Sequence, residues 1–154
     1  CCLGWCYEFG KGVELDEARA VELYRAAAEQ GLPRAQCCLG YCTEKGIGTE
    51  ADPEAAAEWY RRSAEGGYSR GMYNYACCFE NGTGVKKDLA LAQQWYERAA
   101  KEGLPDAMYE LGVWYEDGRC GPKDTAQALA WYKKAAETGH DRARKAVERM
   151  EKLV

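Results

Sequence analysis

The chain has 154 residues, of which 47% are apolar and 30% are charged, so it can bury a core and still present a polar surface. Its 21 Lys and Arg against 25 Asp and Glu give a net charge of -4, which argues against general nucleic-acid binding, because such binding needs a basic face. No apolar run approaches the roughly 18 residues that a membrane helix requires. The chain begins without Met, so we expect its N-terminus to be cut, and the protein to be cytoplasmic, or secreted if a leader was lost.

Four similar segments follow one another along the chain, each displaced by 36 residues with no insertion. Each segment opens with a predicted helix whose apolar residues recur at helical spacing, as at Ala35, Leu39 and Cys42. In the first three segments a Gly-x-Gly follows this helix, because glycine adopts the left-handed conformation that turns the chain. The pattern therefore predicts a helix and then a tight turn.

A second helix is predicted after each turn. An aspartate stands where its N-cap belongs, and Pro53 follows in the second segment. The four predicted caps are Asp16, Asp52, Asp88 and Asp124. Alanines and aromatic residues such as Trp95 and Tyr96 form the apolar face of this helix, so we expect the Trp-Tyr pairs to lie in the core. Because two antiparallel helices cannot bury their apolar faces alone, the repeats are expected to stack around one continuous core.

A single domain of residues 1–154 is the expected organisation. Its helix-turn-helix repeats are residues 1–34, 35–70, 71–106 and 107–142, and segment 143–154 matches only a first helix. Since this last segment is rich in charge, with Arg144, Lys145 and Glu148 among its residues, we expect a capping helix and a natural C-terminus.

The repeated Leu-Gly-x-x-Tyr, Gly-x-Gly, capping Asp and Trp-Tyr-x-x-Ala-Ala resemble the Sel-one-like repeat family, which is related to tetratricopeptide repeats. The resemblance covers nearly the whole chain. It implies an all-α fold, a right-handed α/α superhelical solenoid in which the first helices line a concave face. Departures at Thr43, Ala76 and Cys120 concern local packing.

The chain contains nine cysteines, eight of them on predicted first helices. Neighbouring helices lie about 8–10 Å apart, whereas a disulfide requires Cα atoms within about 7 Å, so a ladder of disulfides is not expected. The resemblance adds that some secreted members join two cysteines eight positions apart; here the first such pair of positions holds Ala28 and Gln36. We favour reduced, buried thiols in a reducing compartment. A zinc site at Cys-Cys-x3-Cys and redox sensing by Cys1, Cys37 or Cys77 are the alternatives.

The candidate binding residues are first-helix positions that, by analogy with tetratricopeptide repeats, point into the groove. They are Trp5, Tyr41, Cys77 and Val113; Cys37, Tyr73 and Tyr109; and Glu8, Glu44, Glu80 and Glu116. An aromatic and apolar stripe beside a row of carboxylates suits a peptide that carries basic side chains among apolar anchors. The alternative is that the glutamates solubilise the face or pair with Arg34, Arg70 and Arg142.

We therefore expect a monomeric, non-enzymatic scaffold that binds a peptide or partner protein in its groove, with no cofactor, metal, nucleic acid or membrane involved. The resemblance leaves two alternatives, a hydrolase-like activity attributed to some members and a purely architectural spacer. Against the first, the sequence shows no nucleophile motif, and both the Gly-x-Gly pairs and His140 are interpreted as turn residues.

Overall fold

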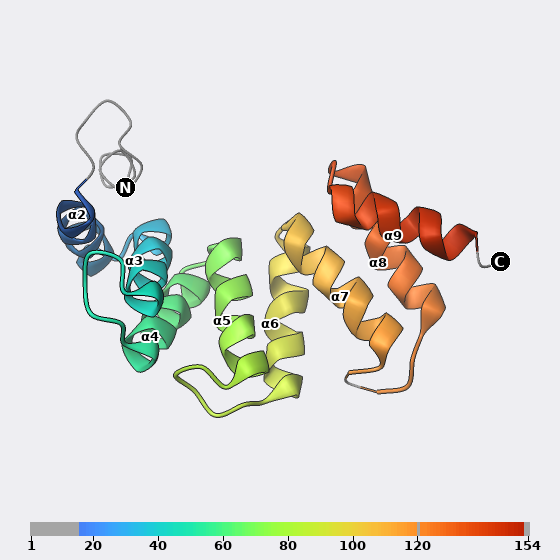
Figure 1. Cartoon of the computed structure of the whole chain (residues 1–154), viewed down its shortest axis with the longest axis horizontal. Coiled ribbons are helices and arrows are strands. Elements are labelled where there is room, and N and C mark those ends of the chain that lie inside the picture. Colours follow the sequence, from blue (N-terminus) through green and yellow to red (C-terminus); the bar gives the residue numbers. More distant parts are fainter. Residues whose placement is uncertain (1–15, 120, 153–154) are drawn as a thin grey trace. The chain divides into compact units, whose positions relative to one another are not determined.

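The computed structural model describes residues 16–119 and 121–152, and every regular element in these ranges is an α-helix, as predicted (Figure 1). The helices are α2 (Glu17–Glu29), α3 (Pro33–Lys45), α4 (Pro53–Glu65), α5 (Ser69–Asn81), α6 (Leu89–Lys101), α7 (Pro105–Asp117), α8 (Thr125–Glu137) and α9 (Asp141–Glu151). They belong to two compact units, residues 1–87 and residues 88–154. Within the described ranges, no helix is long and apolar enough to cross a membrane.

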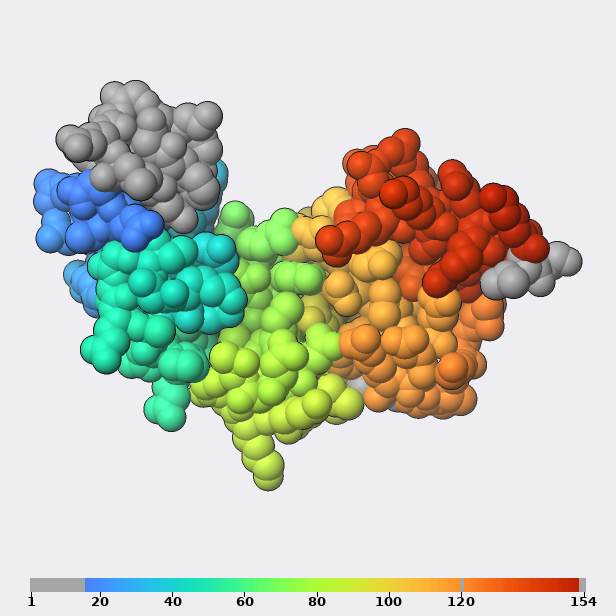
Figure 2. All heavy atoms as spheres, viewed as in Figure 1, coloured from blue at the N-terminus to red at the C-terminus, as the bar shows by residue number. Residues whose placement is uncertain are grey.

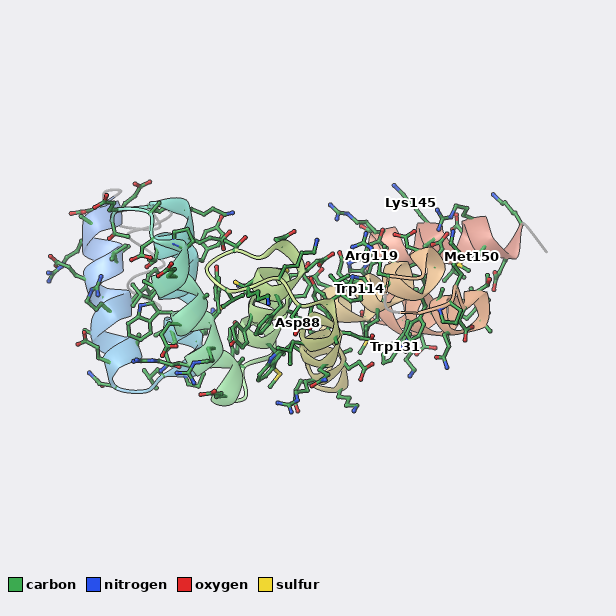
Figure 3. The ribbon with its side chains drawn as sticks, turned by 90° about the horizontal axis from the view of Figure 1, so that it is seen from below. Asp88, Trp114, Arg119, Trp131, Lys145 and Met150 are labelled. Carbon is green, nitrogen blue, oxygen red and sulfur yellow. The ribbon has the colours of Figure 1, made fainter. Side chains whose placement is uncertain are left out.

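The predicted helix boundaries are confirmed by their caps. At the start of α4 the Asp52 carboxylate accepts a hydrogen bond from the amide of Ala55 at 3.0 Å, and Asp88 caps α6 in the same way (Figure 3). Asp16 and Asp124 cap α2 and α8. The first helices α3, α5 and α7 each end at a glycine in the left-handed conformation, as at Gly46 with φ of 69°. These signals divide the chain into helices of 13 residues, with α3 and α4 as examples, and the last helix α9 has 11 residues.

Helix α9 begins with a cap that the sequence did not predict. His140 accepts a hydrogen bond from the amide of Ala143 on its ring Nδ1, at 3.1 Å, while its Nε2 lies 3.2 Å from the Asp106 carboxylate. The residue expected to be an ordinary turn residue is therefore also the N-cap of the last helix.

In each unit a buried tyrosine of a second helix packs against a glycine of the preceding first helix. In the first unit the ring of Tyr60 on α4 lies so close to Gly40 on α3 that a Cβ there would be 2.9 Å from it. In the second unit Tyr132 on α8 approaches Gly112 on α7 in the same way, at 2.5 Å from such a Cβ. The glycine of the Leu-Gly motif is thus explained by steric clearance for the tyrosine ring.

The prediction that both members of each Trp-Tyr pair lie in the core is confirmed for tyrosine and holds only in part for tryptophan, since Trp59 packs against the core of the first unit from its edge. Tyr60 is 1% exposed, whereas Trp59 is only partly buried. The guanidinium of Arg62, three residues on, lies 4.9 Å from the centre of the Trp59 ring. The Arg98 guanidinium lies 4.7 Å from the centre of the Trp95 ring, and the Lys134 ammonium lies 4.3 Å from the centre of the Trp131 ring. Successive residues point about 100° apart around a helix, so tyrosine takes the inward position and tryptophan the flank.

In the second unit α9 packs against α8 (Figures 1 and 2). The contact is apolar: Ala146 and Met150 of α9 are buried together with Ala128 and Tyr132 of α8. Helix α9 therefore covers the apolar face of the α7–α8 hairpin.

Candidate partner-binding site

The described candidate residues lie on α3, α5 and α7, whereas Trp5 and Glu8 lie outside the described residues. Tyr41 is 44% exposed, and Cys37, one turn earlier on α3, is 5% exposed. The half-buried candidates are Glu44 on α3, Tyr73, Cys77 and Glu80 on α5, and Tyr109, Val113 and Glu116 on α7. Tyr41 is therefore the most exposed of the described candidates, and Cys37 is buried.

Three of the candidates meet in a hollow of about 220 Å³ in the first unit, which we call the Glu44 hollow. Tyr41 and Glu44 enter it from α3 and Cys77 from α5. Its other lining residues are Lys45, Tyr60, Asn74, Cys78, Asn81 and Thr83. Tyr73 and Glu80 are not among the lining residues, so the hollow contains only part of the predicted surface.

The carboxylate of Glu44 is fixed from below by Tyr60. The Tyr60 hydroxyl donates to Oε2 of Glu44 at 2.8 Å, and the exposed Lys45 ammonium donates to Oε1 at 2.7 Å. Burial, and then the hydrogen bond to Glu44, hold the pKa of Tyr60 far above its usual range. Tyr60 is therefore a permanent neutral donor that orients the carboxylate.

The rest of the hollow adds hydrogen-bond acceptors and neutral thiols. Asn74 donates through Nδ2 to Sγ of Cys37 at 3.5 Å, and Asn81 donates through Nδ2 to the carbonyl of Cys77 at 3.0 Å. Each amide group thereby keeps its Oδ1 atom as an acceptor. Burial raises the pKa of Cys78 to about 12, so this thiol carries no charge at neutral pH. The hollow is thus acceptor-rich around one carboxylate.

The second unit repeats the arrangement of glutamate and tyrosine. The Tyr132 hydroxyl donates to Oε2 of Glu116 at 2.7 Å. Here a third group joins the pair, because Nη2 of Arg149 on α9 donates to both carboxylate oxygens of Glu116 at 2.7 Å. A neighbouring hollow of about 260 Å³ is basic, with Arg142, Lys145 and Arg149 in its lining.

The link between glutamate and tyrosine was missed by the sequence reasoning. Glu44 and Glu116 each accept from a buried tyrosine sixteen residues later, a role that neither of the two earlier interpretations of the glutamates included. A signal was present, because glutamate and tyrosine both recur at fixed positions in all four repeats. The tyrosines are Tyr24, Tyr60, Tyr96 and Tyr132.

Two other hollows contain none of the candidate residues. One, of about 720 Å³, lies beside the 49–55 segment of the first unit and is bordered by Arg25 and Trp59. The other, of about 230 Å³, lies in the second unit beside Trp114 and Lys123. The Trp114 Nε1 is buried without a hydrogen-bond partner among the described residues, and the Arg119 guanidinium lies 5.9 Å from the centre of the Trp114 ring (Figure 3).

The described cysteines are all thiols in the structure: Cys37, Cys38, Cys42, Cys77 and Cys78. Residues 16–119 and 121–152 contain no group of three or more His, Cys, Asp or Glu side chains that could hold a metal ion. Where the resemblance allowed a disulfide eight positions apart, Gln36 instead donates through Nε2 to the carbonyl of Ala28 at 3.2 Å. A hydrogen bond therefore joins α3 to the end of α2.

Comparison with known proteins supports the fold over nearly the whole chain. The family model for the Sel1 repeat matches residues 3–32, 33–68, 69–104 and 105–140. The crystal structure of a Sel1 repeat protein from Oxalobacter formigenes is 34% identical with a TM-score of 0.86, over 95% of this chain and 58% of that chain. A protective antigen of uropathogenic Escherichia coli strains, described as displaying an SLR fold, is 34% identical with a TM-score of 0.84, over 97% of this chain and 32% of that chain.

A third solved structure, cysteine rich protein B from Helicobacter pylori, is 26% identical with a TM-score of 0.67, over 89% of this chain and 98% of that chain. No similar protein is found among curated proteins. The chain spans less than two thirds of the Oxalobacter protein and about one third of the Escherichia protein. With the helices described above, these similarities establish an all-α helical-repeat solenoid.

Proposed function

The chain belongs to the Sel1 repeat family, whose repeats generally form protein-interaction scaffolds and are typically non-catalytic, and we propose that it binds a partner polypeptide at the Glu44 hollow. The observation that carries the proposal is the hollow itself, in which Tyr41, Glu44 and Cys77 come together from two helices. Interfaces concentrate their binding energy in such concave, partly desolvated places.

Tyr41 is the anchor of this proposed surface. Large apolar side chains that are exposed are few among the described residues, namely Leu32, Tyr41 and Leu91, and Tyr41 is the one aromatic. An aromatic ring offers a large contact area at a low cost in side-chain entropy. Its position at the rim of the hollow suits a partner whose apolar side chain packs on the ring while a polar group enters.

The proposed surface extends beyond the hollow. We include Tyr73 and Glu80 of α5 as further contacts in the first unit. In the second unit we propose a separate surface of Tyr109, Val113 and Glu116, which Arg149 and the apolar face of α9 partly cover. Trp5, Glu8 and the buried Cys37 complete the set. We further propose that the protein is a monomer and that it is cytoplasmic; for the second, the five described thiols are suited to a reducing compartment.

Affinity capture from the source cell tests the proposal. The bait proteins are the unchanged chain, Tyr41→Ala, and Leu91→Ala as a control, since Leu91 is a similarly exposed apolar residue of the second unit. At least one protein should be captured about tenfold less well by Tyr41→Ala, a loss of about 1.4 kcal/mol, and equally well by Leu91→Ala. If quantitative mass spectrometry finds no protein that depends on Tyr41, the surface is assigned wrongly.

A further inference from the structure

In the second unit the chain itself supplies a cation to the glutamate, whereas in the first unit the glutamate borders a hollow. Arg149 of α9 stands two repeats, or 72 residues, after Cys77 of α5, and Glu116 stands 72 residues after Glu44. At Glu116 the guanidinium of Arg149 donates to both carboxylate oxygens. At Glu44 the equivalent position holds the short Cys77 side chain, which lines the hollow.

The next residue on the same helices differs in the same direction. Met150 of α9 is 5% exposed and packs with Tyr132, and its counterpart in the first unit, 72 residues earlier, is Cys78. Cysteine is the smaller side chain. At both positions a long side chain in the second unit is thus replaced by a thiol in the first. Two residues that line the Glu44 hollow, Cys77 and Cys78, therefore have an arginine and a methionine as their counterparts in the second unit.

We propose that the Glu44 hollow is a receptor for an arginine side chain of the partner polypeptide, which takes at Glu44 the place that Arg149 takes at Glu116. The inference rests on the proposed function and names the group that is recognised. The shared element is a carboxylate held by a buried tyrosine hydroxyl, at 2.8 Å for Tyr60 and 2.7 Å for Tyr132. The chain thereby contains an example of the complex it would form.

The other lining groups favour arginine over lysine. A guanidinium has five donors in a plane, whereas an ammonium is a compact point charge with three. Asn74 and Asn81 line the hollow together with Glu44, and each carries an amide oxygen that can accept a hydrogen bond. A carboxylate and two amide groups that line one hollow match a cation that spreads its donors over several directions.

The contact that Glu44 already makes with Lys45 is no obstacle. Both residues lie on α3, and the Lys45 side chain is 50% exposed. An ion pair this exposed is worth about 0–1 kcal/mol, because water and salt screen it. An arriving guanidinium can therefore displace the ammonium, which is then hydrated by solvent.

The test is a nuclear magnetic resonance titration of the full chain with three blocked pentapeptides of alanine whose central residue is arginine, lysine or citrulline. Citrulline keeps the shape of arginine and removes its charge. The arginine peptide should bind with a dissociation constant of about 1 mM and shift the side-chain amide signals of Asn74 and Asn81. The lysine peptide should bind at least threefold more weakly, and the citrulline peptide should cause no saturable shift. Equal shifts with all three peptides would overturn the proposal.

Two variants locate the site. Glu44→Gln should raise the dissociation constant of the arginine peptide at least tenfold. Glu65→Gln removes the same charge from an exposed site on α4 outside the hollow and should leave it unchanged. Cys77→Arg should abolish the shifts, because the chain then fills its own hollow. Binding that survives both Glu44→Gln and Cys77→Arg would place the arginine elsewhere and refute the assignment.

The outcomes also separate this inference from the proposed function. If a cellular partner depends on Tyr41 but not on Glu44, the arginine receptor is wrong and the scaffold surface stands. If capture depends on neither residue, both proposals fail. Analytical ultracentrifugation tests self-association. If the unchanged chain forms a concentration-dependent dimer and Glu44→Gln is monomeric, the hollow binds a second copy of the chain, and the proposal of a different partner polypeptide is wrong.

Discussion

Glu44 and Glu116 are equivalent residues of two units built on one plan, yet their surroundings differ. Glu116 accepts from Arg149 of the following first helix, and Glu44 shares a hollow with Cys77, the counterpart of that arginine. The tyrosine hydroxyl beneath each carboxylate is the same. A repeat scaffold can thus keep an acceptor constant and decide, through one neighbouring position, whether it is satisfied within the chain or presented to a partner.

The buried tyrosine that both units share should make the largest contribution to the free energy of unfolding. Tyr60→Ala and Tyr132→Ala should each lower the free energy of unfolding by about 3–5 kcal/mol, the range for truncating a large buried aromatic residue. Both rings are 1% exposed. Urea denaturation followed by circular dichroism measures the loss, with Trp59→Ala as the control, since Trp59 lies on the flank of its helix. A loss from Trp59→Ala as large as that from Tyr60→Ala would show that the inward face has been misassigned.

Removing only the tyrosine hydroxyl should lower the free energy of unfolding by different amounts in the two units. Tyr60→Phe should cost about 1.5–3 kcal/mol, the usual value for a hydrogen bond to a charged group, because Glu44 then keeps only the exposed Lys45. Tyr132→Phe should cost less, since Glu116 retains Arg149. The same urea titrations measure both, and Tyr41→Phe, at an exposed site, should change nothing. A larger loss at Tyr132 than at Tyr60 would contradict the comparison.

Much of the fold was predictable because its determinants are local. The capping aspartates and the glycine turns each act within a few residues, and those among the described residues appear where the sequence placed them. Tryptophan and tyrosine were harder to separate, since both are large and apolar and only the neighbouring helix decides which ring faces inward. Trp59 accordingly lies on the flank of α4, with Arg62 over its ring.

The site was predicted less completely, because its contacts join residues on different helices. Tyr41, Glu44 and Cys77 meet in one hollow, as their repeat positions suggested. The bond from Tyr60 to Glu44 spans two helices, so helical periodicity along either one could not reveal it. The hollow itself depends on small side chains on α5, which is a property of packing. A repeat-by-repeat comparison of side-chain size would have indicated it.

Alkaline pH should weaken the first unit through its thiols. Burial raises the pKa of Cys37 and of Cys78 to about 12, from an ordinary value of 9.0. Above pH 9 the unfolded chain loses these protons while the folded chain keeps them, so the free energy of unfolding falls as pH rises, and the contribution of the neutral thiols is fully present only below pH 9. The counterparts in the second unit are Tyr109 and Met150, which are not thiols.

Urea titrations at pH 7, 9 and 10 measure this slope. A double variant, Cys37→Ala with Cys78→Ala, should be less stable at pH 7 but should lose less of its remaining stability between pH 9 and pH 10 than the unchanged chain. Identical slopes for the two proteins would mean that other groups cause the alkaline loss.

The smallest expected change in the free energy of unfolding comes from giving one unit the residue of the other. Cys77→Arg should give the first unit the contact that Arg149 makes in the second, and should raise the free energy of unfolding by up to about 1 kcal/mol, the upper value for an exposed ion pair. Arg149→Ala should lower it by a similar amount, since the Arg149 side chain is 55% exposed and its contact with Glu116 is open to water. A double-mutant cycle between Cys77→Arg and Glu44→Gln isolates the new pair, and its coupling energy should vanish in 1 M salt, where the Debye length is about 3 Å. A coupling energy of zero at low salt would show that an arginine on α5 does not reach Glu44, and the equivalence between the hollow and the filled site would then be lost.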